Sequence, residues 1–395
     1  MTIVAWLMSV VAALLALPVL ILAVEAAAAF LSRSKGRATD AAKPDGVRFA
    51  ILVPAHNEEA GIRATLDNLR GELTPGSRLL VVADNCSDGT AAAARAAGAE
   101  VIERHDLSRR GKGYALDFGR SYLASDPPQV VVFVDADCQV THGLPAVLAG
   151  LANAFGRPVQ AKYDLSIPDN PSTAERVAAF AWIVKTHIRP LGLKGLGLPC
   201  QLMGTGMAVP WGALERVELA SAHLVEDVKL GLDLAALGAA PLYHPTVRVV
   251  SEQPPSARGA HVQRQRWETG SLQVLAQTAP RMLLRSVSTG NIRLLAMAVD
   301  LLVPPLMLLI LLESLGLLAF GSTWLLGGPP LPASIVCTSL IVLAAVLLAC
   351  WLGYARHTLR LTDILLLPVL IFRKVAFYAG AWRNRGSGWV RTDRQ

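Results

Sequence analysis

Long apolar segments at both ends of the chain restrict its fold more than any other feature of the sequence. Residues 1–31 contain one charged residue, Glu25, and the chain is largely apolar again over residues 294–320 and 334–354. About 20 apolar residues are enough for a helix to span a bilayer. We therefore expect an N-terminal membrane helix at residues 1–31 and a membrane hairpin at residues 291–355, with a soluble domain between them.

The first segment could instead be a cleaved signal peptide. It lacks a basic start, and its apolar run exceeds the roughly 7–15 residues of a signal sequence, so we expect a retained anchor. The predicted linker that follows, residues 32–46, carries Arg33, Lys35 and Arg37. Basic residues beside a membrane helix mark the cytoplasmic side. The soluble domain is therefore expected in the cytoplasm, at a bacterial-type inner (plasma) membrane.

The C-terminal segment, residues 356–395, is expected to lie along the membrane as an interfacial helix with a basic cytoplasmic tail. Its apolar stretch is interrupted at the centre by Arg373 and Lys374. Charges at mid-bilayer are costly, whereas an interfacial helix keeps them in water. The hairpin carries Asp300 and Glu313, for which a role in a lipid or glycan passage and a place near the headgroups both remain open.

The composition excludes several classes of protein. Hydrophobic residues make up 53% and charged residues 17%, which is more apolar than soluble domains, where these shares are roughly 45–50% and 25%. The net charge of +7 is accompanied by no nucleic-acid motif, so we expect no nucleic-acid partner. Five cysteines without a CxxC spacing favour a reducing compartment. Paired hydrophobic repeats, as in transporters, are absent from the sequence.

The soluble domain is expected at residues 47–290, and from Val47 to about Leu165 it alternates short apolar runs with helical ones. Strands are expected at 49–53, 79–83, 101–102 and 130–134, and helices at 58–69, 90–97, 114–124 and 144–155. This alternation predicts an α/β domain with a mostly parallel sheet and flanking helices. Ligands bind beyond the carboxyl ends of such strands. Polar clusters at 54–59, 84–90 and 135–139 follow three of the strands, so we expect a site at that edge.

Two carboxylates, Asp135 and Asp137, leave the fourth predicted strand together. Carboxylate oxygens suit Mg²⁺ or Mn²⁺, and such a cation would neutralise charge on a leaving diphosphate. A surface acidic turn is the alternative. Gly111, Lys112 and Gly113 precede a predicted helix, whose N-terminus favours anions such as a diphosphate. Here the alternative is a basic surface turn.

Two further motifs lie in the second half of the soluble domain. Glu226 and Asp227 enter a predicted helix, where a carboxylate could accept the proton of an acceptor hydroxyl or simply favour the helix dipole. Gln263, Arg266 and Trp267 share one helix face by their spacing. That face could bind phosphate and stack on a sugar or base, or lie on the membrane surface.

Together the motifs resemble the family 2 glycosyltransferases. In chain order they read Val-Pro-Ala-His-Asn-Glu-Glu at 53–59, Asp-Asn-Cys-Ser-Asp-Gly-Thr at 84–90, Gly-Lys-Gly at 111–113, Asp-Ala-Asp at 135–137, Glu-Asp at 226–227 and Gln-x-x-Arg-Trp at 263–267. The resemblance is greatest to the membrane-bound branch of cellulose, hyaluronan and chitin synthases and ceramide glucosyltransferases. It implies a GT-A fold with a nucleotide-binding sheet, and inverting transfer from a nucleoside diphosphate sugar, often UDP-linked.

The resemblance also implies residue roles. The donor-binding residues would be Pro54, His56, Glu58, Asp84, Lys112, Asp135, Gln263, Arg266 and Trp267. The metal ligands would be Asp137, Asp135 and Gln139. The catalytic residues would be Asp227, as general base, and Glu226. The acceptor end would be lined by Gly204, Thr205 and Gly206.

Two positions depart from the family pattern. His56 stands where many members carry Tyr, which leaves the selectivity for the base open, and Val225 stands where processive synthases carry Thr, which leaves the acceptor loop open. The leading interpretation is a hexosyltransferase that adds a sugar from a UDP-type donor to a membrane lipid or a growing exopolysaccharide. Three membrane helices are few for a polysaccharide channel, so we expect addition of one or a few sugars unless subunits assemble.

Two alternatives stay open. The first is a polyprenyl-phosphate glycosyltransferase, against which the Gln-x-x-Arg-Trp motif argues because that branch generally lacks it. The second is a catalytically silent subunit that binds nucleotide sugar within a polysaccharide secretion complex, whose other subunits would then be partners. The intact acidic motifs argue against the silent subunit.

Overall fold

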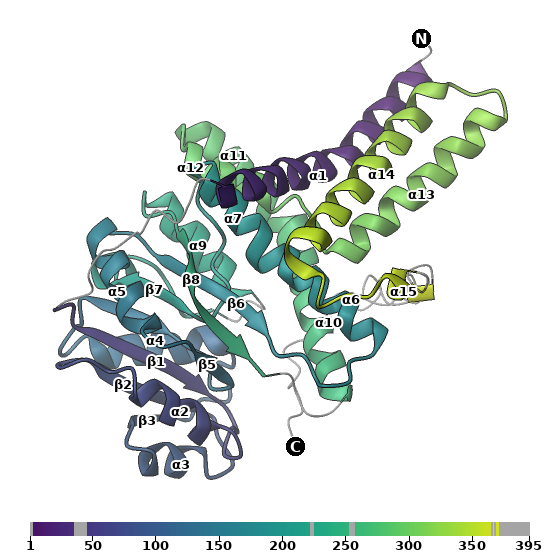
Figure 1. Cartoon of the computed structure of the whole chain (residues 1–395). Helices are drawn as coiled ribbons and strands as arrows, with labels where there is room; N and C mark the ends of the chain where they lie inside the picture. Colours follow the sequence, from purple (N-terminus) through teal and green to yellow (C-terminus); the bar gives the residue numbers. More distant parts are fainter. Residues whose placement is uncertain are drawn as a thin grey trace.

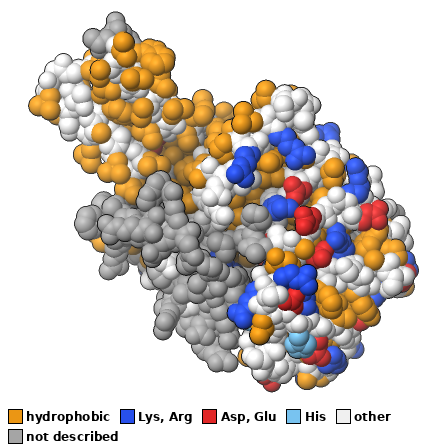
Figure 2. Space-filling view, turned by 180° about the vertical axis from the view of Figure 1, so that it is seen from behind, with side chains coloured by type: hydrophobic (Ala, Val, Ile, Leu, Met, Phe, Trp, Pro, Cys, Tyr) orange, Lys and Arg blue, Asp and Glu red, His pale blue; other side chains and the backbone are white. Residues whose placement is uncertain are grey.

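The computed structural model describes residues 3–34, 46–221, 225–252, 257–364, 366 and 369–370. Within them, an α/β domain carries long apolar helices that project from one end (Figure 1). Figure 2 shows hydrophobic side chains gathered over the projecting helices, whereas Lys, Arg, Asp and Glu side chains are spread over the α/β domain. The described part of the molecule therefore separates an apolar end from a charged one.

The described strands form one mixed sheet in the order β3-β2-β1-β4-β7-β6-β8-β5. Their bounds are β1 Phe49–Ala55, β2 Arg78–Asp84, β3 Glu100–Arg104, β4 Val130–Phe133, β5 Cys138–Val140, β6 Val159–Leu165, β7 Met207–Pro210 and β8 Leu242–Ser251. Strands β3, β2, β1 and β4 run parallel, and so do β6 and β8. Strands β7 and β5 pair antiparallel with their neighbours. The predicted α/β fold is confirmed, and the four strands expected from the sequence are the adjacent parallel strands β1 to β4.

Helices cover both faces of this sheet. Those of the α/β domain are α2 Ile62–Arg70, α3 Thr90–Ala96, α4 Lys112–Leu123, α5 Leu144–Phe155, α6 Thr173–Ile183, the π-helical turn η1 Val184–Ile188, α7 Arg189–Gly195, α8 Trp211–Leu214, α9 Glu226–Ala236, α10 Ala257–Gln273, η2 Val274–Thr278, α11 Ala279–Thr289 and α12 Ile292–Asp300. The remaining helices are α1 Ile3–Ser34, α13 Leu306–Leu325, α14 Pro330–Cys350, η3 Trp351–Ala355 and α15 Leu361–Ile364.

The strand β1 lies at the centre of the core. Ile51 and Val53 belong to the apolar cluster under α2 and α5, whereas Leu52 belongs to the cluster under α4 and α9. Successive side chains of a strand point to opposite faces, and a strand buried on both faces reads as a continuous apolar run. On the second face α4 approaches closely, because a Cβ on Gly119 would lie 2.5 Å from Leu52 Cδ1.

Three of the described helices are long and apolar enough to cross a membrane. They are Ile3–Ser32, Leu306–Leu325 and Pro330–Ala355. They pack together beside the sheet domain, with α1 against α14 and α7, and α13 against α14 (Figure 1). The sequence indicated these same three apolar segments.

The second apolar segment, residues 294–320, is divided in the structure. Its first part forms α12, which ends at Asp300 and packs against α9 of the sheet domain. Pro304 and Pro305 follow, and α13 begins immediately after them. Proline lacks an N–H and disfavours helical backbone in the residue before it. The proline pair therefore separates a helix of the sheet domain from one of the three helices that are long and apolar enough to cross a membrane.

A buried ion triad ties α1 to the sheet domain. Arg189, the first residue of α7, places its Nε 2.7 Å from Glu25 Oε2 and its Nη2 2.5 Å from Asp300 Oδ1. All three side chains are buried, and buried charges persist where they are paired. Two of the three acidic residues that interrupt the apolar segments, Glu25 and Asp300, are thus partners of one arginine. Glu313 lies apart from them and accepts a hydrogen bond of 3.0 Å from Ser339 Oγ of α14.

Several sequence predictions lie outside the described residues. They concern Lys35 and Arg37 of the linker, and Arg373 and Lys374 of the interfacial segment. The described part of the linker continues α1 as far as Ser34.

Candidate functional site

A cavity of about 1040 Å³ opens at the carboxyl ends of β1, β2 and β4. Small-molecule sites range over roughly 300–1,000 Å³, so this one has room for two substrates. Of the residues predicted for the site, those that line it are Pro54, His56, Glu58, Asp84, Lys112, Asp135, Asp137, Gly204, Glu226, Asp227, Gln263, Arg266 and Trp267. Gln139, Thr205 and Gly206 do not line it.

The acidic motif after β4 forms a small cluster. One ligand atom each from Asp135, Asp137 and Cys138 lies within 4.8 Å of the others. Cys138 donates a hydrogen bond to Asp137 Oδ1 at 3.5 Å, and Ser251 Oγ donates to Asp137 Oδ2 at 3.3 Å. A hard divalent cation prefers oxygen ligands. The two carboxylates are therefore the atoms of this cluster that could hold one.

Lys112 links the acidic motif to the acidic pair on α9. It is the first residue of α4, and its Nζ lies 2.5 Å from Asp135 Oδ1 and 3.8 Å from Glu226 Oε1. It also donates to the carbonyl oxygen of Gly204 at 2.9 Å. Burial alone lowers the pKa of Lys112, but Asp135 and Glu226 outweigh burial, so the net shift is upward. This amine stays protonated at neutral pH and offers a positive charge to the cavity.

Glu226 and Asp227 form the first turn of α9 and face the cavity. Burial raises the pKa of both carboxyls above the usual range, and Lys112 opposes the rise in each. For Glu226 the pKa reaches about 7. A carboxylate with a raised pKa is a better proton acceptor near neutral pH. The environment thus suits this pair to proton transfer.

Gly204 fits tightly between Lys112 and Asp227. Its φ is +84°, and a Cβ there would lie 3.3 Å from Lys112 Nζ and 3.4 Å from Asp227 Oδ2. Glycine adopts this left-handed conformation without the steric cost that a Cβ brings. The two predicted neighbours of Gly204 act behind the cavity wall: Thr205 Oγ1 accepts from the Asp135 amide at 3.1 Å, and Gly206 packs on Val249.

The loop that carries Gly204 is held by a buried glutamine that sequence reasoning missed. The Gln160 amide nitrogen donates to the carbonyl of Thr205 at 2.9 Å, and its Oε1 accepts from the Met203 amide at 2.9 Å. Gln160 sits on β6 and is fully buried. No local signal marks it, because a lone Gln among the mixed residues of β6 has no motif around it.

The edge formed by β1 and β2 carries unusual backbone. Asn57 has a φ of 54° and Asn85 a φ of 52°, a region that few residues other than glycine adopt. Asp84 accepts a hydrogen bond of 2.6 Å from the buried Arg104 at the end of β3, and His56 Nδ1 lies 2.7 Å from the Asp84 carbonyl oxygen. These contacts fix the backbone and the Asp84 side chain at this edge of the sheet before any ligand binds. Arg104 was not anticipated, since it carries no motif in the sequence.

An aromatic wall continues from Trp267 of α10. Its ring lies 4.7 Å from that of Trp182 on α6, tilted by 31°, and the Trp182 ring meets Tyr163 edge-on at 5.0 Å. Trp182 Nε1 also donates to the Tyr163 carbonyl at 3.1 Å. Trp182 and Tyr163 escaped sequence analysis because they come from elements far from Trp267 along the chain. Flat aromatic faces of this kind suit the stacking of a ring-shaped ligand.

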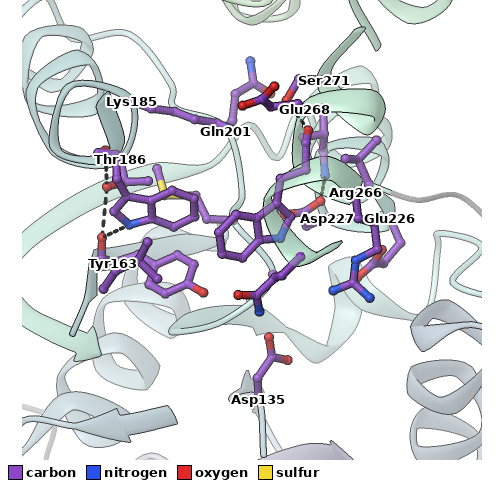
Figure 3. A pocket seen from close by; sticks show the side chains of 18 of the residues that line it. Asp135, Tyr163, Lys185, Thr186, Gln201, Glu226, Asp227, Arg266, Glu268 and Ser271 are labelled. Carbon is purple, nitrogen blue, oxygen red and sulfur yellow. Dashed lines mark hydrogen bonds between the residues drawn. The ribbon is translucent and has the colours of Figure 1, made fainter. Parts of the chain in front are cut away.

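The close view places the labelled side chains around the cavity. Figure 3 shows Asp227, Glu226 and Arg266 on one side, and Asp135 at the end away from Lys185 and Gln201. Beyond the end where Lys185 and Gln201 lie, the lining continues to the apolar helices. It includes Leu22 of α1, Val303 and Pro304 just before α13, and Met307 of α13. The cavity therefore runs from the carboxyl ends of the strands to the long apolar helices α1 and α13.

Residues 44–270 match the sequence model of a family described as "Glycosyltransferase like family 2". No curated protein matches the chain. Among solved structures, a mannosyltransferase from Pyrobaculum calidifontis in complex with GDP-mannose and Mn²⁺ is similar at 20% identity and a TM-score of 0.48, covering 85% of this chain and 99% of that one. Glucosyl-3-phosphoglycerate synthase from Mycobacterium tuberculosis is similar at 22% identity and a TM-score of 0.39, covering 62% and 82%. The family match spans more than half of the chain, from before β1 into α10.

Proposed function

Because the chain belongs to the glycosyltransferase-like family 2, we propose that it is a membrane-bound, inverting hexosyltransferase. It takes a sugar from a nucleoside diphosphate sugar, UDP-linked, and transfers it to a membrane lipid or a growing exopolysaccharide. One observation carries the proposal: Lys112 lies 2.5 Å from Asp135 and 3.8 Å from Glu226, between the acidic motif and the acidic pair. These residues all line one cavity, so a donor site and a base would share it.

The donor half would be formed by the ends of β1 and β2 and by α10. Asp84 and His56 would contact the ribose and base, with Asp84 held by Arg104. Lys112 would contact the diphosphate, since an amine at a helix N-terminus adds a point charge to a place that already favours anions. Arg266 and the Trp267 ring would cover the donor from the side of α10.

The metal site would be formed by Asp135 and Asp137, and the ion would be Mg²⁺ or Mn²⁺. The residues fit such an ion because their carboxylate oxygens lie close together at the cavity wall. A cation bound there supplies charge neutralisation for the leaving diphosphate. Gln139 was included in the predicted metal set; it lies on β5 outside the cavity lining, so we assign the ion to the carboxylates.

The acceptor would be activated by Asp227. Its carboxylate would take the proton of the acceptor hydroxyl as the oxygen attacks the anomeric carbon, and burial supports this role by raising the carboxyl pKa. Glu226 also interacts with the positive charge of Lys112, and Lys112 limits the rise in the pKa of both Glu226 and Asp227. Because base and leaving group act from different sides of the sugar, a single displacement inverts the anomeric carbon.

The membrane location rests on α1 and the α13–α14 hairpin, which are long and apolar enough to span a bilayer. The basic residues after α1 would keep the sheet domain in the cytoplasm by the positive-inside rule. Such an enzyme meets its soluble donor in the cytoplasm and its acceptor at the plasma membrane.

A screen of radiolabelled nucleotide sugars against membranes that contain the full chain tests the proposal. We expect one UDP-sugar to label a product that requires Mg²⁺ or Mn²⁺ and disappears in Asp227→Asn membranes. Extraction then separates lipid products from polymer. Binding of UDP-sugar with no transfer and no hydrolysis in any condition would instead indicate a silent subunit.

A further inference from the structure

The proposed donor site occupies one half of the cavity. The other half, which faces the apolar helices, has no ligand assigned to it. Its wall includes Leu22 of α1, Val303 and Pro304 between α12 and α13, and Met307 of α13. These residues are apolar, and they belong to the base of the helices that would enter the bilayer. A ligand that approaches the proton acceptor Asp227 from this side would therefore need an apolar portion to contact this wall.

One basic side chain in this half has no counter-ion assigned to it. Lys185 lies on η1, three residues after Trp182, and its side chain is exposed to the cavity. Within the described parts of the chain, its Nζ makes no hydrogen bond or ion pair, and its nearest ring contact is Trp182 at 6.0 Å. By contrast, Arg189 one turn further on is neutralised by Glu25 and Asp300.

The charged groups around Lys185 come from several elements. Asp227, Arg189, Asp300 and Glu268 all act on it electrostatically. Of the three carboxylates, Asp227 is the proposed base, Asp300 is already paired with Arg189, and Glu268 acts on Lys185 without forming an ion pair with it. Because the Lys185 ammonium group is open to the cavity and is held by none of these carboxylates, it is available to bind a ligand anion.

A second polar group in the same half also lacks a partner. The Gln201 amide nitrogen donates to the Met297 carbonyl and to Asp300 Oδ2, each at 2.9 Å. Its Oε1 is buried and has no hydrogen-bond partner among the described residues. Figure 3 shows Gln201 and Lys185 together at the end of the cavity away from Asp135. This end therefore offers a cation and a hydrogen-bond acceptor to one polar head.

Resting on the proposed function, we propose that the acceptor is a lipid phosphate whose phosphate binds Lys185. Its tail would leave the cavity between Leu22 and Met307, and the group that receives the sugar would extend along the Trp182–Trp267 wall to Asp227. Lysine suits a phosphate as a point charge, and charge-assisted hydrogen bonds are the strong ones.

The transfer leaves the lipid phosphate intact. The acceptor hydroxyl loses its proton to Asp227, and its oxygen forms a bond with the anomeric carbon of the donor sugar. The bond from that carbon to the diphosphate breaks, and its electron pair leaves with the nucleoside diphosphate. Lys185 holds the acceptor phosphate throughout and takes no part in the proton transfer.

Equilibrium binding to the full chain in detergent, with UDP and Mn²⁺ present, tests the proposal with three probes. Hexadecyl phosphate has both tail and anion, 1-O-hexadecylglycerol has the tail alone, and inorganic phosphate has the anion alone. We expect hexadecyl phosphate to bind about tenfold more tightly than either other probe, as one charged hydrogen bond predicts. Equal binding of the two lipids would overturn the proposal. Equal binding of inorganic phosphate would overturn it in favour of a soluble phosphorylated acceptor.

Three variants assign the effect to the residue. Lys185→Gln should lose about tenfold in affinity for hexadecyl phosphate, and Lys185→Arg should retain it. Lys194→Gln is the matched control, because Lys194 lies further along the same helical segment and outside the cavity lining. Unchanged affinity in Lys185→Gln, or an equal loss in Lys194→Gln, would refute the role of Lys185.

UDP binding separates this proposal from the proposed function. UDP should bind all three variants with wild-type affinity, which also reports that they are folded. If wild type itself failed to bind UDP, the proposed function would fall, whatever the lipids did. If Lys185→Gln alone failed to bind UDP, the comparison of the two lipids on wild type would still decide whether a lipid phosphate is recognised.

Discussion

At the scale of single residues, short sequence motifs predicted most of the polar lining of the cavity. The motif residues of β1, β2, α4 and α10 line one space, because the carboxyl ends of neighbouring strands meet at one edge of a sheet. Gln160 and Trp182 could not be found this way, because each acts through contacts with residues far away in the chain, such as the Thr205 carbonyl bound by Gln160. Lys185 could not be found either, because it is a single lysine outside the motifs.

Removing the proposed metal ligand should abolish cation-dependent turnover. Asp137→Ala deletes one of two carboxylates at the cavity wall, and a cation contributes several kcal/mol of charge stabilisation, so we expect at least about a 100-fold loss. The measurement is turnover against Mn²⁺ concentration in purified membranes. Near-normal turnover of this variant in the presence of chelator would exclude the metal role.

Gly204 should be required for activity for reasons of space. In Gly204→Ala the new Cβ meets Lys112 Nζ and Asp227 Oδ2 at 3.3 and 3.4 Å, so the two charged groups must move apart and turnover should fall at least tenfold. Gly197→Ala is the control, because Gly197 also has a positive φ but open space around it. Both variants should lose about 1–2 kcal/mol of stability from backbone strain. Equal turnover in the two would refute the packing argument.

At the scale of elements, the sequence predicted the adjacent parallel strands β1 to β4 and did not predict β5 to β8. Strand β1 was recognisable because it is buried on both faces and therefore continuously apolar. Strand β5 escaped notice because it is short and begins directly after the acidic motif. Strand β6, whose sequence mixes Gln, Lys and Asp with apolar residues, has no simple period. Strand β6 is recognisable only in the structure, where it pairs with β8.

The contact between α6 and α10 predicts how Trp267 behaves. Trp267→Ala removes the ring that stacks on Trp182 at 4.7 Å, and aromatic pairs contribute roughly 0.5–1.5 kcal/mol. We expect thermal stability to drop by about this amount, and UDP affinity and turnover to fall together. Trp267→Phe keeps a ring and should recover most of both. Wild-type kinetics in Trp267→Ala would make this face of α10 a structural surface only.

At the scale of the whole molecule, the ion triad connects the long apolar helix α1 to the sheet domain. Both acids of the triad stand out in the sequence as charges within apolar segments, but their shared partner could not be predicted. Arg189 follows 164 residues after Glu25 and precedes Asp300 by 111. Only the packing of α7 between α1 and α12 brings the three together.

Breaking this triad should destabilise the full chain. Arg189→Met leaves two buried carboxylates without their cation, and removing one partner of a buried pair costs about 3–5 kcal/mol. Thermal unfolding in detergent measures the loss. Lys194→Met, on the exposed side of the same helix, should be close to neutral. A stable Arg189→Met variant would show that the triad contributes little to holding α1.

The central claim is that Asp227 accepts the proton of the acceptor, and turnover measured beside UDP affinity in Asp227→Asn tests it most directly. Asp233→Asn is the matched control, since Asp233 lies on the same helix, outside the cavity, and pairs with Lys229. The account predicts a loss of turnover of about 10²- to 10⁴-fold in Asp227→Asn, with UDP affinity unchanged, and no loss in Asp233→Asn. Retained turnover in Asp227→Asn, or lost UDP binding with turnover intact, would contradict it.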